Sequence, residues 1–198
     1  MKFLGSQFYI LLLIACFFFL DQKAYAQTAP RFSAGAMILF GQGQMGNGSD
    51  VPDRAMMHTP IAFFGGVNFK KFRVGLNYEY NMVNQTADPA SVSNQNLSGT
   101  GTAPGLRLEF YDGKQSAGLI YRLSNTYNLA KPTVNGSSSI YTASGGFSLQ
   151  YFRQFKNRFG FVLDYTTEAF TKSVAPPSGN VKYSRISAGI VFSNFAGK

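Results

Sequence analysis

The sequence is short of the residues on which many enzymes and disulfide-stabilised proteins depend. Its 198 residues include one cysteine, one histidine and no tryptophan, and only nine of them are acidic. A chain with one cysteine cannot form an internal disulfide bond, so a secreted form must be held together by other means. No segment after residue 26 has an apolar run long enough to form a transmembrane helix. The length suits one domain with a core of its own.

The first 26 residues have the pattern of a secretory signal peptide. Lys2 precedes a continuous apolar run over residues 8–20, which is too short to span a bilayer comfortably. Ala24-Tyr25-Ala26 then supplies a small-residue cleavage site, so we expect a mature barrel domain over residues 27–198. An alternative is a lipoprotein signal acylated at Cys16, but the apolar run continues past that cysteine.

Most of the mature chain consists of segments in which apolar and polar residues alternate. A period of two indicates β-strands with one apolar and one polar face. Most of these segments reach the about 9–11 residues that a tilted strand needs to cross the hydrocarbon of a membrane. We predict eight strands, over residues 31–42, 61–70, 72–85, 104–111, 116–128, 139–154, 159–172 and 181–195.

The two faces are clearest in segment 72–85, where Val74 and Leu76 lie opposite Arg73 and Glu79. In segment 139–154 the same pattern places Ala143 on the apolar face. The polar face is interrupted at three positions, which are Met37, Leu39 and Ile120.

The connections between the segments alternate in length. Tight turns alternate with longer polar loops, which is typical of an up-and-down membrane barrel and unlike a Greek-key sandwich. The turns cover residues 70–73, 112–115 and 155–158, and the loops cover residues 43–60, 86–103, 129–138 and 173–180.

Aromatic residues gather at both ends of the predicted strands. Two aromatic belts are expected where a membrane barrel meets the two headgroup layers. The belt beside the turns contains Phe69, Phe72, Phe110, Tyr111, Tyr151, Phe155 and Phe159, and the belt beside the loops contains Tyr80, Tyr127, Tyr141, Tyr165 and Tyr183.

The polar face is rich in glycine and carries charges of both signs. Glycine weakens a strand, but a crowded lumen needs small residues beside large ones. Charges buried in a lumen must pair, because an unpaired buried charge is very costly. We therefore predict a lumen charge cluster of four arginines and four carboxylates, namely Arg73, Glu79, Arg107, Glu109, Arg122, Asp164, Glu168 and Arg185.

The net charge of +9 comes largely from basic residues beside the short turns. Such a rim suits the anionic lipids of the inner leaflet, or it is a solvated surface that promotes solubility. Because an exported chain rarely meets nucleic acid, we expect no nucleic-acid partner. The predicted periplasmic basic rim contains Lys70, Lys71, Lys114, Arg153, Lys156 and Arg158.

With these residues in view, the chain resembles the small eight-stranded outer-membrane barrels of the OmpA/OmpX kind. The resemblance covers residues 30–195 and rests on architecture. Ser187, Gly189 and Phe192 match the signal in the last strand that barrel-assembly machinery reads, although Asn194 takes the next hydrophobic position. The resemblance implies an all-β, eight-stranded antiparallel up-and-down transmembrane β-barrel in a bacterial outer membrane. It also implies membrane lipids and the assembly machinery as partners, and no cofactor.

Candidate catalytic or metal-binding residues are few. His58 lies in predicted loop 43–60 with Ser49, Asp50 and Asp53, and some small outer-membrane barrels modify lipid A with histidine and serine residues. Here the spacing forms neither a nucleophile elbow nor a metal-ligand pair. We therefore predict no catalytic, cofactor or metal residue.

The leading hypothesis is a non-enzymatic structural or surface-interaction barrel, or an accessory subunit of an envelope complex. An eight-stranded lumen is filled by its own side chains, which disfavours a general diffusion pore. The alternatives are a narrow ion or solute channel, a lipid-modifying enzyme at His58, and a soluble carrier with an apolar interior.

Overall fold

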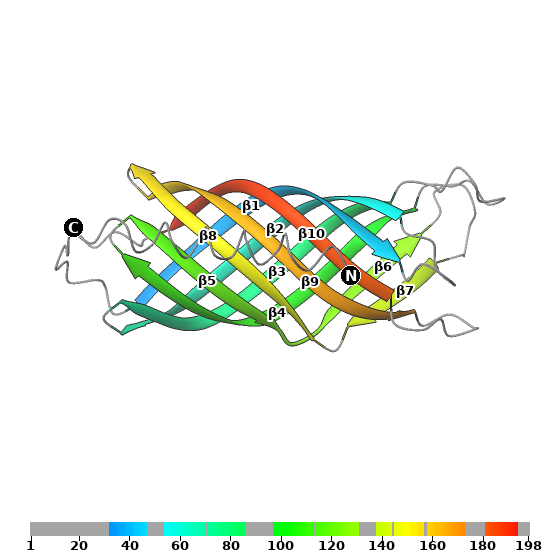
Figure 1. Cartoon of the computed structure of the whole chain (residues 1–198), viewed down its shortest axis with the longest axis horizontal. Helices are drawn as coiled ribbons and strands as arrows, with labels where there is room; N and C mark the ends of the chain where they lie inside the picture. Colours follow the sequence, from blue (N-terminus) through cyan, green and yellow to red (C-terminus); the bar gives the residue numbers. More distant parts are fainter. Residues whose placement is uncertain are drawn as a thin grey trace, which may run out of the picture.

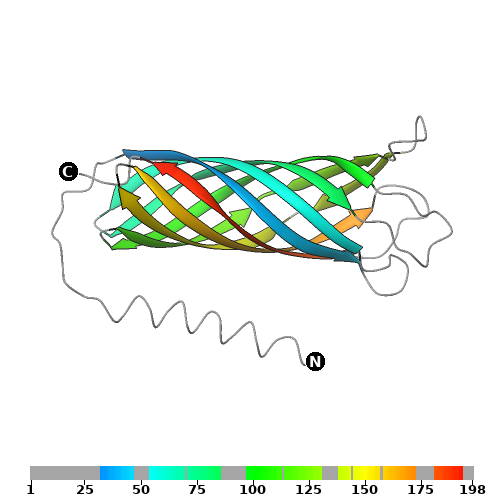
Figure 2. The ribbon, with the colours of Figure 1, turned by 90° about the horizontal axis from the view of Figure 1, so that it is seen from above.

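The structure, a computed structural model, is a cylinder of long, tilted strands (Figures 1 and 2). It describes residues 32–46, 54–69, 71–85, 97–112, 114–130, 138–143, 145–156, 158–172 and 181–193. The predicted signal peptide lies outside the described residues. The strands are β1 (Phe32–Gly46), β2 (Arg54–Phe69), β3 (Phe72–Gln85), β4 (Leu97–Asp112), β5 (Gln115–Arg122), β6 (Asn125–Ala130), β7 (Ser138–Ala143), β8 (Gly146–Lys156), β9 (Phe159–Lys172) and β10 (Val181–Ser193).

The ten strands occupy eight positions around a closed barrel. β10 pairs with both β9 and β1, so the sheet has no free edge. β5 and β6 both pair with β4, and β7 and β8 both pair with β9, so each couple shares one position. All pairs are antiparallel. The predicted eight-stranded up-and-down barrel is confirmed, and closure gives every strand two neighbours for its backbone hydrogen bonds.

The barrel has two distinct ends. At the turn end, short connections join β2 to β3, β4 to β5 and β8 to β9. At the loop end, longer connections join the strands, and these lie outside the described residues. No helix among the described residues is long and apolar enough to cross a membrane.

Several strands extend further towards the loop end than the alternation predicts. β2 begins at Arg54, where residues 43–60 were expected to be a loop, and β4 begins at Leu97, within predicted loop 86–103. The expected boundaries were wrong because the apolar residues change face near the loop end. Alternation continues there, but it no longer has the apolar-outside pattern of the membrane segment.

Two irregularities lie opposite each other in the hairpin formed by β5–β6 and β7–β8. Arg122 pairs with Gly146 and Asn125 pairs with Ala143, so the two halves of the hairpin stay in register. Between these pairs, Leu123 and Ser124 are both exposed. The register against β4 and against β9 shifts by one residue, as at a β-bulge.

This double bulge changes which residues face inward. Before it, even-numbered residues of β5 are buried, and after it, odd-numbered residues of β6 are buried. Ala143 is therefore buried, and its predicted place on the outer apolar face was wrong. Tyr127 is also buried inside the barrel, although it was predicted to lie in the aromatic belt beside the loops.

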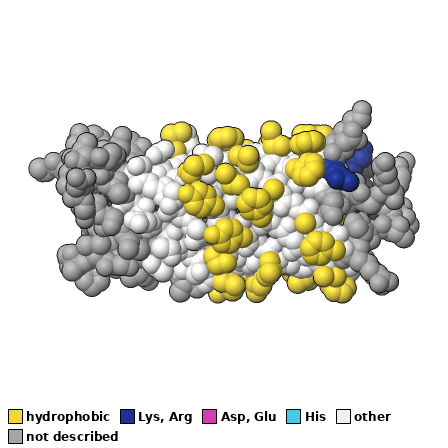
Figure 3. All heavy atoms as spheres, turned by 180° about the vertical axis from the view of Figure 1, so that it is seen from behind, with side chains coloured by type: hydrophobic (Ala, Val, Ile, Leu, Met, Phe, Trp, Pro, Cys, Tyr) yellow, Lys and Arg dark blue, Asp and Glu magenta, His cyan; other side chains and the backbone are white. Residues whose placement is uncertain are grey.

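Apolar side chains cover the outside of the barrel from the turn end to a level near Phe40 in β1 and Met82 in β3. In β3 this face runs from Phe72 to Met82, which matches the ~9–11 residues of a membrane-crossing strand. Figure 3 shows these apolar side chains over the middle and turn end of one face of the barrel. An aromatic row at the turn end confirms that predicted belt in its exposed members, Phe69, Phe72, Phe155 and Phe159.

Beyond that level the polarity of the wall is reversed. The outward residues are mainly polar and exposed; they include Gln42, Gln44, Asn84, Thr100, Thr126, Asn128, Thr142, Thr167 and Lys182. The inward residues there are apolar. They form a cluster that we call the apolar cap, made of Met45, Met56, Val83, Tyr127, Leu129, Ala143, Phe170, Val181 and Tyr183. Tyr183 was predicted in the loop-side belt, and its burial corrects that prediction as well.

A second apolar cluster fills part of the lumen nearer the turn end. It comes from β1, β2, β8, β9 and β10, and we call it the turn-side cluster. Met37 and Leu39, which interrupted the predicted polar face, belong to it. The interior is therefore apolar near the loop end and partly apolar beside the charged residues nearer the turn end, and is not wholly polar, as the sequence had suggested. The other members are Ala62, Phe64, Phe152, Val162 and Val191.

Gly101 makes room for the apolar cap. A Cβ atom at this position would lie 2.3 Å from Cδ1 of Tyr127 and 2.8 Å from the backbone oxygen of Thr126. We expect Gly101→Ala to destabilise the barrel by about 1–3 kcal/mol, because the ring must leave its position. Urea unfolding of vesicle-inserted protein measures the change.

Gly118→Ala is the matched control. Gly118 also faces the lumen, but its nearest atom beyond the local backbone would be 3.6 Å from the new Cβ. Equal unfolding free energies for the two variants would contradict the packing of Tyr127 against Gly101.

Candidate functional site

The most distinctive feature of the molecule is the ionic network inside the barrel. All eight residues of the predicted lumen charge cluster are buried and face inward. They come from β3, β4, β5, β9 and β10, so strands far apart in the sequence meet in one site. Four guanidinium groups face four carboxylates, and the network as a whole is neutral.

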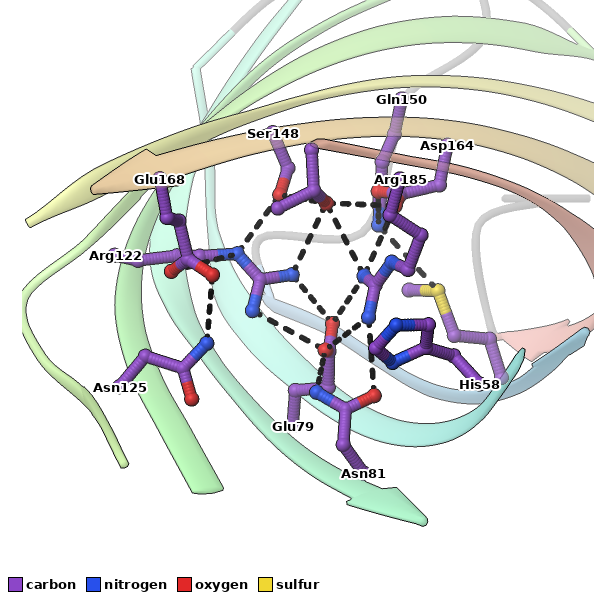
Figure 4. Close-up of polar contacts among 12 residues, drawn as sticks. His58, Glu79, Asn81, Arg122, Asn125, Ser148, Gln150, Asp164, Glu168 and Arg185 are labelled. Carbon is purple, nitrogen blue, oxygen red and sulfur yellow. Dashed lines mark hydrogen bonds and ion pairs between the residues drawn. The ribbon is translucent and has the colours of Figure 1, made fainter. Parts of the chain in front are cut away.

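Glu79 is the centre of the network (Figure 4). Its carboxylate lies between the guanidinium groups of Arg122 and Arg185, with shortest N–O distances of 2.6 and 2.9 Å. Asn81 donates a further hydrogen bond to it. Both oxygens of Glu79 accept from both arginines, so this single carboxylate fixes two cations.

Arg185 connects Glu79 to the opposite wall of the barrel. Its Nη2 atom donates to Asp164 at 3.1 Å and to Thr166 at 3.1 Å. Gln150 then donates to Asp164 at 2.9 Å and accepts from Arg107 at 2.7 Å. Gln150 thus joins the central group to the turn-side group.

The turn-side group repeats the central arrangement with Glu109. Arg73 and Arg107 each donate to Oε2 of Glu109 at 2.8 Å, and Ser116 donates to its other oxygen. The guanidinium of Arg107 also lies 4.5 Å from the centre of the Phe64 ring. The turn-side cluster therefore contacts the network through a cation–π interaction.

Glu168 ends the network towards the apolar cap. Its carboxylate accepts from Asn125 at 2.7 Å and lies 3.8 Å from Nε of Arg122. A Cβ at Gly146 would lie 2.2 Å from Cγ of Glu168, so this glycine is required for the carboxylate to fit. The double bulge brings Asn125 inward beside Glu168.

The network is arranged to fill the lumen and hold opposite walls together. Paired arginines and carboxylates neutralise each other, and the neutral side chains between them add further hydrogen bonds. Among the described residues, no group of three or more His, Cys, Asp or Glu side chains is placed to hold a metal ion.

His58 lies inside the barrel in β2, and its predicted position in a solvated loop was wrong. The Tyr183 hydroxyl is 3.1 Å from its Nε2 atom, and the Tyr127 ring packs against it at 6.1 Å between centroids. His58 thus lies between the apolar cap and the ionic network. Ser49, Asp50 and Asp53, its neighbours in the sequence, lie outside the described residues.

Part of the predicted basic rim is visible at the turn end. Lys71, Lys114, Arg153 and Arg158 are exposed there. Lys71 pairs with Asp112 at 3.3 Å across an exposed contact. Lys70 and the side chain of Lys156 lie outside the described part of the chain.

Sequence reasoning missed the aromatic residues that close the loop end. Tyr127 and Tyr183 looked like belt residues because tyrosine at a strand end is common in membrane barrels. The alternation of Val181, Tyr183 and Arg185 on one face is the signal that could have placed Tyr183 inside. No comparable signal exists for Tyr127, because the double bulge breaks the alternation before it.

The fold has relatives among solved structures. Ail, the attachment invasion locus protein of Yersinia pestis, solved with the heparin analogue sucrose octasulfate, has a TM-score of 0.54 and 11% sequence identity over 83% of this chain and 99% of its own. Neisserial surface protein A has a TM-score of 0.46 and 15% identity, over 84% of this chain and 99% of its own. The outer-membrane protein AlkL has a TM-score of 0.42 and 13% identity, over 90% and 95%. No protein-family model and no curated protein matches the chain.

The chain therefore has the fold of the small eight-stranded outer-membrane barrels, as its sequence pattern predicted.

Glu79→Gln tests the central role of this carboxylate. The variant leaves two buried guanidinium groups with one negative partner fewer, so we expect a loss of about 3–5 kcal/mol in unfolding free energy. Urea unfolding in vesicles measures it. The control is Asp112→Asn, which breaks an exposed pair and should cost about 1 kcal/mol or less. Equal losses would show that Glu79 does not organise the lumen.

Proposed function

We propose that this chain is an integral barrel of a bacterial outer membrane. Its role is non-enzymatic: a closed, rigid base that presents its loop end as a surface for contact with other molecules. The observation that carries this proposal is the combination of an apolar outer belt with a lumen filled by paired charges and two apolar clusters. Over the height of a bilayer, apolar side chains face outward and charged side chains face inward, which is the reverse of a soluble barrel.

The outer belt supports the membrane location. Large apolar side chains such as Leu76 and Ile190, 66% and 65% exposed, would be a severe aggregation liability in water. In lipid they are the expected surface of a barrel whose strands are paired in a closed sheet. The basic residues at the turn end are suited to anionic headgroups of the inner leaflet.

The filled lumen supports a non-conducting role. An eight-stranded barrel has an interior just wide enough for side chains. Here four buried arginines, the largest of the charged side chains, occupy it, and the apolar cap lies between the ionic network and the loop end. A file of water through the barrel would have to pass both.

The loop end is where function is expected. Loops on a rigid scaffold commonly carry binding residues, and the four connections there are the longest in the barrel. Ail, whose name refers to attachment and invasion, has this fold. The role proposed for this chain is of the same class: its loop end contacts a surface molecule or a partner protein of the envelope.

An arginine scan of the outer wall tests the membrane location. Leu76 lies near the middle of the apolar belt. We therefore expect Leu76→Arg to destabilise the vesicle-inserted barrel by about 2–4 kcal/mol. Thr100→Arg, on the polar outer wall at the loop end, should have little effect. Equal tolerance of both substitutions, together with solubility of the purified protein without detergent, would contradict a membrane-spanning barrel.

Conductance in planar bilayers tests the closed lumen. The wild-type barrel should insert, migrate as a heat-modifiable band on gels and give no steady current. Glu79→Gln is the informative companion, because disrupting the network is the change expected to admit water. A steady current from the wild-type barrel would favour the narrow-channel alternative instead.

A further inference from the structure

The outer wall contains a groove where β10, β1 and β2 lie side by side. Its volume is about 580 Å³, within the ~300–1,000 Å³ of small-ligand pockets. Phe40, Met57 and Ile186 project beside it and are 66%, 59% and 63% exposed. Ala188, the register partner of Phe40, is the small residue between these larger ones.

The groove lies at the level where the outer wall changes from apolar to polar. In β1 the outward residues change from Phe40 to Gln42, and in β3 they change from Met82 to Asn84. Gln42 and Asn84 both line the groove. One end of the groove is therefore apolar, and the other presents side-chain amides.

The hydrogen-bond ladder between β1 and β2 is interrupted beside the groove. Ile38 pairs with Ile61 and Gly41 pairs with His58, with the same register, but the two positions between them are not paired. Pro60 lies in this interval and has no N–H to donate. β1 and β2 are therefore joined by fewer cross-strand pairs at this level of the wall.

A buried hydroxyl lies at the same level, on the lumen side of the wall. Ser187 lines the groove and is the register partner of Gly41. Its Oγ is buried and has no hydrogen-bond partner among the described residues. The interrupted pairing of β1 with β2, the Ser187 hydroxyl without a partner and the side-chain amides of Gln42 and Asn84 therefore lie at one place in the wall.

We propose that this wall groove binds one acyl chain of a membrane lipid, with the ester or hydroxyl group of that lipid beside Gln42 and Asn84. The proposal rests on the membrane location proposed above. No Lys, Arg, Asp or Glu side chain of the described strands lines the groove, so it recognises the uncharged part of the lipid and not its phosphate. Because the groove continues the lipid-facing belt, its ligand is a lipid chain and not a peptide.

The test counts lipids that stay bound to the barrel. The full mature chain is refolded into phosphatidylethanolamine vesicles, extracted in a mild detergent and measured by native mass spectrometry. Wild-type protein should retain one phosphatidylethanolamine per barrel. Ala188→Phe places a ring in the groove and should reduce the lipid-bound fraction about tenfold, equivalent to about 1.4 kcal/mol of affinity.

Ala117→Phe is the matched control, because Ala117 also faces outward but lies in β5, away from the groove. It should retain lipid as the wild type does. Should A188F fail to insert, Thr59→Phe fills the groove from β2 and gives the same readout.

Three results would overturn the proposal: equal lipid retention by A188F and wild type, a wild-type barrel without lipid, or bound detergent in place of lipid. A current in the wild type that A188F abolishes would instead identify the wall groove as an opening into the lumen. Flotation of the barrel with the vesicles separates the two proposals. A barrel that floats without retaining lipid disproves only the groove, whereas one that does not float disproves the membrane location.

Discussion

The rest of the structure depends on the pairing of Glu79 with Arg122 and Arg185. These three side chains come from β3, β5 and β10, so their contacts join opposite walls across the lumen. Because each arginine also reaches a carboxylate of β9, the central group connects four strands. A closed sheet joins only neighbouring strands, whereas the ionic network also joins strands that face each other across the lumen.

The wall changes its polarity along its length because its surroundings change. Over the belt, lipid outside favours Leu76 and its neighbours, and the inside must be filled by groups that satisfy one another. Above the belt, water outside favours residues such as Thr100, and an apolar cap inside is then the more stable filling. The loop end is thus built like a small soluble barrel on top of a membrane barrel, and His58 lies where the two fillings meet.

The membrane part could be predicted from the sequence, and the loop end could not. Where lipid surrounds the wall, alternation assigns faces without ambiguity, so Arg73, Glu79 and Arg107 were placed inward. Alternation reports only that neighbours differ, so it carries no information on which face meets water once the polarity reverses. The start of β2 was missed for that reason. Tyr183 was missed because tyrosine at a strand end is common in an aromatic belt, although its alternation with Arg185 places it inside. Tyr127 and Ala143 were missed because a bulge adds one residue, and one residue exchanges inside and outside.

The paired position of the two bulges has a physical reason of its own. A single bulge in one strand of the hairpin would turn inward residues of β6 towards outward residues of β7, and neither face would stay consistent. Two bulges at the same height keep the hairpin in register and move its whole upper half by one residue relative to β4 and β9. This shift places Tyr127 in the apolar cap and Asn125 beside Glu168. Because the inward side chains contact one another so closely, a change of function is least costly at the loops and on the outer wall, where no buried partner must change as well.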